Sequence, residues 1–153
     1  MGLIGSMSRG HMITSALLVA ALLLDLSWPR PDPEQRQAQR LLGADGQRVE
    51  LESGPAFRVG ARWLLFFDQQ GKVGPIRGAI LIEDDHIRDL LLFEEREGVH
   101  HSALSDPAFA GSLVSQPAKA PVEVDAISGA TISSQLLIDA INRSLEQWRS
   151  AVR

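Results

Sequence analysis

The feature that most constrains the fold is a block of three apolar runs between Ala61 and Glu94, separated by two short polar turns. The runs cover Ala61–Asp68, Ile76–Glu83 and His86–Glu94. Each has the length and the Ile, Leu and Phe content that are typical of buried strands. Asp84-Asp85, between the second and third runs, suits a tight hairpin turn. The block therefore predicts an antiparallel sheet.

The segments around this block predict a few smaller elements. Asp32, Pro33 and Gly43 are placed to cap, begin and end a short helix. "ADGQRVELESG" is typical of a turn and a short polar strand, and "VEVD" (122–125) of a last short strand. The region 96–121 predicts mostly loop, with a helical turn around Ala108.

The C-terminal segment, Ser133 to Val152, predicts a helix with one apolar face. The residues expected on that face are Leu136, Leu137, Ala140, Ile141, Leu145 and Trp148. Strands followed by a helix, without regular β-α alternation, favour an α+β fold with a small, mainly antiparallel sheet packed against helices. Trp63, Phe66 and Phe67 lie in an apolar strand, so we interpret them as core residues.

Composition excludes several classes of site. The 153-residue chain contains no cysteine, so disulfides, zinc-thiolate sites, iron–sulfur clusters and thioether-linked haem are excluded. Its four histidines are too poorly spaced to predict a metal site. A net charge of −4 without a basic stripe argues against nucleic-acid binding.

The most apolar run is Met12 to Trp28, interrupted near its end by Asp25. It reaches the lower limit of about 17 residues for a membrane-spanning helix. We favour an uncleaved membrane anchor, with a cleaved signal peptide as the second interpretation and a buried soluble helix as the third. The expected organisation is a tail and anchor over 1–28, a linker with a short helix over 29–44, and one domain over 45–153.

The stretch "DAISGATISS", Asp125 to Ser134, places small and hydroxyl-bearing residues directly before the last helix. Gly129 and Ala130 keep this turn compact, and a helix N-terminus presents unpaired N–H groups with a partial positive charge. Such an end can hold a phosphate. The alternative interpretation is simply a capped helix start, with Thr131, Ser133 or Ser134 as the cap.

Asp125 to Thr131 resembles the flavinylation motif Asp-x-x-(Ser/Thr)-Gly-Ala-(Thr/Ser) of the FMN-binding domain family. That family includes flavin subunits of the sodium-translocating NADH:quinone reductase and of the Rnf complex. A weaker resemblance extends over about residues 40 to 149. It implies an ester between the Thr131 hydroxyl and the phosphate of FMN, installed from FAD and Mg²⁺ by a flavin transferase outside the cytoplasm.

The resemblance also implies roles for the neighbours of Thr131. Ser128, Gly129 and Ala130 would form the cradle of the attachment point, and N–H groups around Ile132 and Ser133 would hold the phosphate. Asp125 would be read by the transferase or would tie down the turn. The larger family members carry a Glu-Thr-x-Gly stretch after the hairpin, and this chain has "EEREGVHHSALSD" there instead.

The function implied is that of an electron-transfer module, anchored in a membrane on its extracytoplasmic (periplasmic) side, with redox proteins as partners. No nicotinamide fingerprint or acid–base pair indicates an independent enzyme. Two alternatives stay open: a flavin-free binding or sensory domain of the same fold, and a small FMN-dependent reductase.

Overall fold

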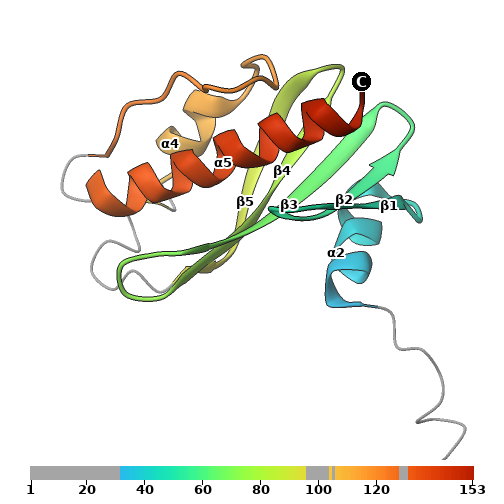
Figure 1. Cartoon of the computed structure of the whole chain (residues 1–153), viewed down its shortest axis with the longest axis horizontal. Helices are drawn as coiled ribbons and strands as arrows, with labels where there is room; N and C mark the ends of the chain where they lie inside the picture. The colour runs from blue at the N-terminus through green and yellow to red at the C-terminus, as the bar shows by residue number, and fades with distance from the viewer. Residues whose placement is uncertain (1–31, 96–103, 105, 128–130) are drawn as a thin grey trace, which may run out of the picture. The chain divides into compact units, whose positions relative to one another are not determined.

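The computed structural model describes residues 32–95, 104, 106–127 and 131–153. Pro33–Arg153 form one compact unit. Its sheet has five antiparallel strands in the order of the chain, and helices pack on both faces (Figure 1). The α+β class and the antiparallel sheet are therefore confirmed. The strands are β1 (Gln47–Leu51), β2 (Gly54–Val59), β3 (Arg62–Gln70), β4 (Pro75–Glu83) and β5 (His86–Glu95).

The central hairpins follow the sequence pattern closely. β3 pairs with β4 from Arg62↔Glu83 to Gln70↔Pro75, and β4 pairs with β5 around the predicted Asp84-Asp85 turn. Both aspartates have positive φ values, 51° and 61°, which a two-residue turn requires when its twist matches that of the strands. The predicted hairpin is therefore confirmed.

Three helices occur among the described residues: α2 (Pro33–Leu42), α4 (Pro107–Leu113) and α5 (Thr131–Ala151). α2 ends as predicted at Gly43, whose φ is 74° and whose N–H donates to the Gln39 carbonyl. The helical turn expected around Ala108 is α4, capped by the Asp106 carboxylate. No helix in the described part of the chain is long and apolar enough to cross a membrane. The predicted anchor, Met12 to Trp28, lies outside the described residues.

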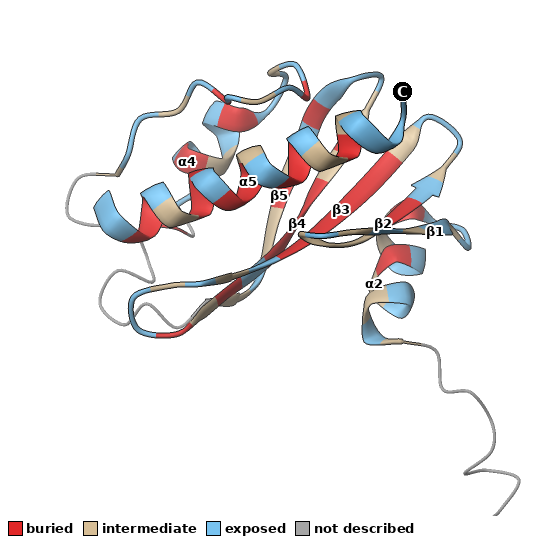
Figure 2. Ribbon diagram, in the orientation of Figure 1, coloured by how far each residue is buried: buried red, intermediate tan, exposed pale blue. Residues whose placement is uncertain are grey.

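The core has two layers, one on each face of the sheet (Figure 2). α4 and α5 cover one face, where Trp63, Leu65 and Phe67 meet the apolar side of α5. α2 covers part of the other face, where Ala38 and Leu42 pack against Phe57. Trp63, Phe66 and Phe67 are all buried, so their assignment to the core is confirmed.

Three sequence-based predictions need correction. β2 was missed, because its short run "GPAFRV" contains Gly and Pro and is brought into the sheet by β1 and β3. The "VEVD" strand is wrong, since residues 122–125 form no regular element. α5 begins at Thr131 rather than Ser133. Of the predicted apolar face, Leu136 is only half-buried and the other five residues are buried.

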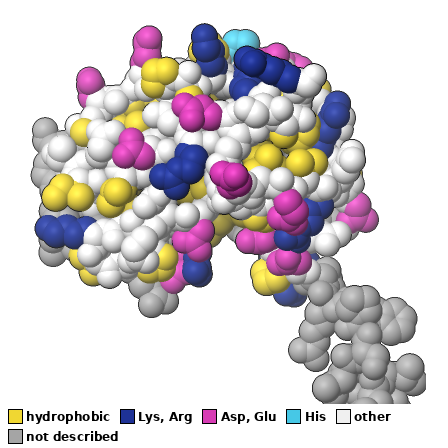
Figure 3. Space-filling view, in the orientation of Figure 1, with side chains coloured by type: hydrophobic (Ala, Val, Ile, Leu, Met, Phe, Trp, Pro, Cys, Tyr) yellow, Lys and Arg dark blue, Asp and Glu magenta, His cyan; other side chains and the backbone are white. Residues whose placement is uncertain are grey.

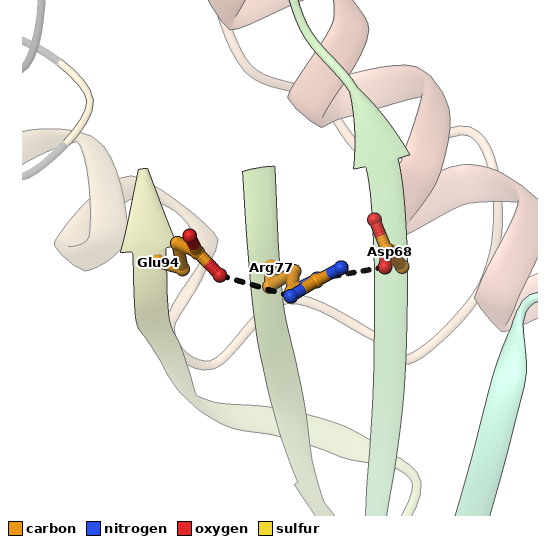
Figure 4. Close-up of polar contacts among 3 residues, drawn as sticks. All are labelled: Asp68, Arg77 and Glu94. Atoms are coloured by element: carbon orange, nitrogen blue, oxygen red, sulfur yellow. Dashed lines mark hydrogen bonds and ion pairs between the residues drawn. The ribbon is translucent and has the colours of Figure 1, made fainter. Parts of the chain in front are cut away.

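An ion-pair network joins the last three strands across the sheet (Figure 4). The Arg77 guanidinium on β4 donates to Asp68 on β3 at 2.7 Å and to Glu94 on β5 at 2.9 Å. The hydrogen bond to Asp68 and the charges of both carboxylates raise the pKa of Arg77 above its usual value. The three side chains are solvated, so the network fixes strand register more than it stabilises the fold. Elsewhere on the face seen in Figure 3, Lys and Arg side chains are interspersed with Asp and Glu.

Candidate functional site

Thr131 is the first residue of α5, and its side chain is exposed. Ile132 beside it is 58 % exposed, whereas Ser133 and Ser134 are 2 % and 0 % exposed. The first turn of this 21-residue helix contains no acidic residue. The positive end of the helix dipole therefore has no carboxylate from its own first turn, and an anion placed there is stabilised.

Ser134 fastens the segment that leads into the helix. Its hydroxyl accepts a hydrogen bond from the Ile127 N–H at 3.1 Å and donates one to the Thr131 carbonyl at 3.2 Å. One buried hydroxyl thus contacts the backbone at both ends of the Ile127–Thr131 stretch. The two hydrogen bonds therefore tie Ile127 to the first turn of α5.

Side chains also hold the preceding residues 122–127, which have no strand partner. The Val122 N–H donates to Asn142 Oδ1 on α5 at 2.9 Å. The Gln116 amide both accepts from the Glu123 N–H at 3.0 Å and donates to the Glu123 carbonyl at 2.9 Å. The Gln116 side-chain amide thus makes the two hydrogen bonds to Glu123 that the backbone of a neighbouring strand would make in a sheet. These bonds hold Val122 and Glu123 in place although they lie in an irregular segment.

A cleft of about 330 Å³ lies beside this segment, between it and α4. Its lining residues are Asp106, Ala108, Phe109, Ser112, Glu123, Val124, Asp125 and Ile127. The volume is at the lower end of the ~300–1,000 Å³ range of ligand pockets. Its acidic side chains disfavour a phosphate inside it, so a neutral group suits the cleft better than an anion does.

The predicted site residues fall in three groups. Thr131 and Ile132 are exposed at the start of α5, and Asp125 is exposed at the cleft. The Ser133 side chain is buried, so only its backbone N–H can serve a ligand at the helix end. Ser128, Gly129 and Ala130 lie outside the described residues.

Sequence reasoning did not assign positioning roles to Gln116, Ser134 and Asn142. Ser134 was noted as a hydroxyl in the first helical turn, but its bond to Ile127 spans seven residues. Gln116 and Asn142 contact backbone groups seven and twenty residues away. Such contacts leave no local pattern in the sequence. A polar residue on a loop or helix surface looks the same in the sequence whether or not it makes one.

Residues 71–146 match the family model described as FMN-binding domain. The match begins in the β3–β4 turn and ends within α5, so it includes the central hairpin and the whole motif. The chain thus belongs to the FMN-binding domain family, and FMN is its cofactor. A comparison with curated protein sequences gave no match.

The described residues fit FMN in two respects. The N-terminus of α5 offers backbone N–H groups and a partial positive charge, which suit a phosphate. Beside it, Ile132 and the cleft along Val124 and Ile127 offer apolar surface to a flat, neutral ring system. The candidate cofactor site therefore comprises the start of α5 and the cleft lined by Val124 and Ile127.

Proposed function

We propose that Thr131 carries FMN covalently, through an ester between its hydroxyl oxygen and the flavin phosphate. One observation supports this above all: Thr131 is exposed at the first residue of α5, while Ser133 and Ser134 are buried. The family match makes the cofactor FMN, and Thr131 is the exposed hydroxyl among the described residues of the motif.

The attachment reaction balances as a transfer from FAD. The Thr131 oxygen attacks the FMN phosphorus, the pyrophosphate bond breaks, and AMP leaves while the hydroxyl proton passes to a base. No His, Asp or Glu among the described residues is positioned next to Thr131 by any hydrogen bond, so the base belongs to the modifying enzyme. An exposed acceptor on a tethered turn suits entry into that enzyme's active site. Asp125, exposed six residues earlier, is available to be contacted by it.

Once attached, the flavin supplies one- and two-electron redox chemistry. The chain's own residues then have binding roles. N–H groups around Ile132 and Ser133 would hold the phosphate, and the small residues Ser128, Gly129 and Ala130 would serve as its cradle. Ile132, Val124 and Ile127 shield one side of the ring system from water.

We propose that the protein works as an electron-transfer module between redox partner proteins. Anchoring by Met12–Trp28 would place it on the extracytoplasmic side of a membrane, where the family's transferase acts. The apolar run supports the anchor, and the exposed position of Thr131 supports access for both the transferase and the redox partners.

The test is co-expression with a flavin transferase, followed by denaturing electrophoresis and in-gel flavin fluorescence. We expect the wild-type chain to retain flavin, Thr131→Val to lose it, and Thr131→Ser to keep a part of it. Ser150→Ala removes an exposed hydroxyl at the other end of the same helix and is the matched control. Peptide mass mapping locates the adduct.

Covalent FMN on Thr131→Val would disprove the acceptor assignment. Loss of flavin from Ser150→Ala as well would show that the fluorescence reports folding rather than attachment. A circular dichroism spectrum of Thr131→Val that matches wild type completes the comparison.

A further inference from the structure

A second cleft, of about 970 Å³, lies at the opposite end of α5 from Thr131. It is bounded by β1 to β3, by the β4–β5 turn, by the loop after α4 and by the last residues of the chain. Trp148 in this cleft is seventeen residues after Thr131, which corresponds to about 25 Å along a helix. The cleft is therefore separate from the proposed flavin site.

Two buried indoles form the floor of this cleft. Trp63 on β3 and Trp148 on α5 pack edge to face, with ring centroids 6.0 Å apart. They are 9 % and 2 % exposed. Two arginines of the cleft lie over these rings: Arg58 Cζ is 5.3 Å from the Trp63 ring centroid and Arg149 Cζ is 4.9 Å from the Trp148 ring centroid. A guanidinium that lies over an aromatic ring can also stack with a further planar group.

The cleft is basic although the chain is acidic. Four cationic side chains line it, Arg58, Lys119, Arg149 and Arg153, against the carboxylates of Asp85, of Glu146 and of the Arg153 main chain. The net charge of the whole chain is −4. A local excess of positive charge inside a cleft raises the concentration of anions there.

Only one of these cations is neutralised by an ion pair within the described residues. Arg149 pairs with Asp85 at 3.4 Å and donates to the Ala118 carbonyl at 2.9 Å. Arg58 donates through Nε to the Gly60 carbonyl and has no carboxylate partner in the described part of the chain. Lys119, which also lines the cleft, has no ion-pair partner in the described part of the chain either. Cations left without partners beside apolar walls favour a ligand that brings its own negative charge.

We propose that this cleft binds a small organic anion with a planar apolar body, of the class of aromatic carboxylates. Arg58 and Lys119 hold the carboxylate, since a guanidinium presents paired donors to it. The planar body stacks on a guanidinium that is itself stacked on an indole, and Val49 and Ala120 form the apolar wall. The cleft volume suffices for such a molecule. This site is independent of FMN attachment.

The indole N–H groups make binding directly measurable. The chain has three tryptophans, and Trp28→Phe leaves only the two in the cleft. The probe is benzoate, titrated into the purified full-length Trp28→Phe protein while ¹H–¹⁵N spectra are recorded. We expect saturable shifts of both indole signals. Benzamide, a neutral molecule of the same shape, should bind roughly tenfold more weakly, because it lacks the charge.

Lys72 and Lys119 are the chain's two lysines. Replacing each one in turn distinguishes binding in this cleft from a general attraction of benzoate to positive charge. Both are exposed, so either can be replaced without disturbing the core. Lys119→Gln should weaken benzoate binding about five- to tenfold, and Lys72→Gln, in the β3–β4 turn, should not change it. Equal effects of the two variants would overturn the proposal. So would equal binding of benzamide and benzoate, inorganic phosphate binding as tightly as benzoate, or the absence of any indole shift.

Discussion

Replacing Ser134 with alanine tests whether the motif is positioned by the hydroxyl that links Ile127 to Thr131. The variant removes the acceptor of the Ile127 N–H, which is partly buried. Leaving such a donor without a partner costs about 1–3 kcal/mol. For a domain of this size, each kcal/mol lowers Tm by roughly 3–5 °C. We expect a fall of about 3–15 °C.

Ser144→Ala is the matched control for this variant. Ser144 is also fully buried on α5, but its hydroxyl donates to the Ala140 carbonyl one turn earlier and touches nothing in the motif. That carbonyl belongs to the regular helix, so the variant should cost less than Ser134→Ala. It should load flavin at the wild-type rate.

Flavin loading distinguishes a positioning role of Ser134 from a purely structural one. With Ile127 released, the turn before Thr131 samples more conformations, and about 1.4 kcal/mol of lost order corresponds to tenfold slower loading. The assay is the rate of FMN incorporation by a flavin transferase at a temperature where all variants are folded. Equal loading rates and equal unfolding midpoints for Ser134→Ala and Ser144→Ala would refute the reasoning.

Three further predictions concern the rest of the chain. Leu137→Ala should destabilise the domain by about 2–5 kcal/mol in urea unfolding, since Leu137 is fully buried between α5 and the sheet; unchanged stability would contradict the packing. Gly78→Ala should cost about 1–3 kcal/mol, because its Cβ would lie 2.4 Å from the Leu91 carbonyl and 2.6 Å from the Phe67 ring. The control Gly111→Ala has open space and should stabilise α4 by up to about 1 kcal/mol. A reporter fused after Arg153 should be active outside the cytoplasm, and activity confined to the cytoplasm would contradict the proposed topology.

The parts of the fold that could be predicted are those whose signal is local. β3, β4 and β5 are long apolar runs with turn residues between them, and α2 has a cap, a proline and a terminal glycine in order. β2 could not be predicted, because its six residues gain their structure from pairing with β1 and β3. "VEVD" alternates like a strand, yet no neighbouring strand is in reach, and its backbone bonds to Gln116 and Asn142 instead.

The candidate site likewise has a part that could be predicted from the sequence and a part that could not. The sequence identified the Asp125–Thr131 motif and the helix after it, since residue types and order carry that signal. It did not indicate the cleft along α4 or the contacts of Gln116 and Asn142. These depend on where the loop after α4 returns to the sheet. There the Ser115 N–H donates to the Ile87 carbonyl and the Ile87 N–H donates to the Gln116 carbonyl, between residues far apart in sequence.

The apolar period of α5 also determines which hydroxyls at the start of the helix are exposed. Side chains on a helix are turned by about 100° per residue, so Ser134 lies within about 20° of the buried Ile141. By the same arithmetic, Ser133 lies about 40° from the buried Leu137. Thr131 is turned about 80° from Ile141 and 120° from Leu137, and Ile132 is turned about 180° from Ile141. Observed burial follows this order, with both serines inside and both Thr131 and Ile132 outside.

The packing of α5 on the sheet therefore leaves Thr131 as the exposed hydroxyl in the first turn, and the proposed acceptor can be tested by moving that hydroxyl. Moving the hydroxyl to position 132, by combining Thr131→Val with Ile132→Thr, keeps it exposed at the same helix end. Moving it to position 133 or 134 puts it against the sheet. If exposure at the first turn is sufficient, Thr131→Val/Ile132→Thr should regain part of the covalent flavin that Thr131→Val loses, with the adduct at position 132 in peptide mass mapping. If the folded double variant carries no covalent flavin, exposure alone does not define the acceptor. The transferase would then also require the acceptor at a fixed distance in sequence from Gly129.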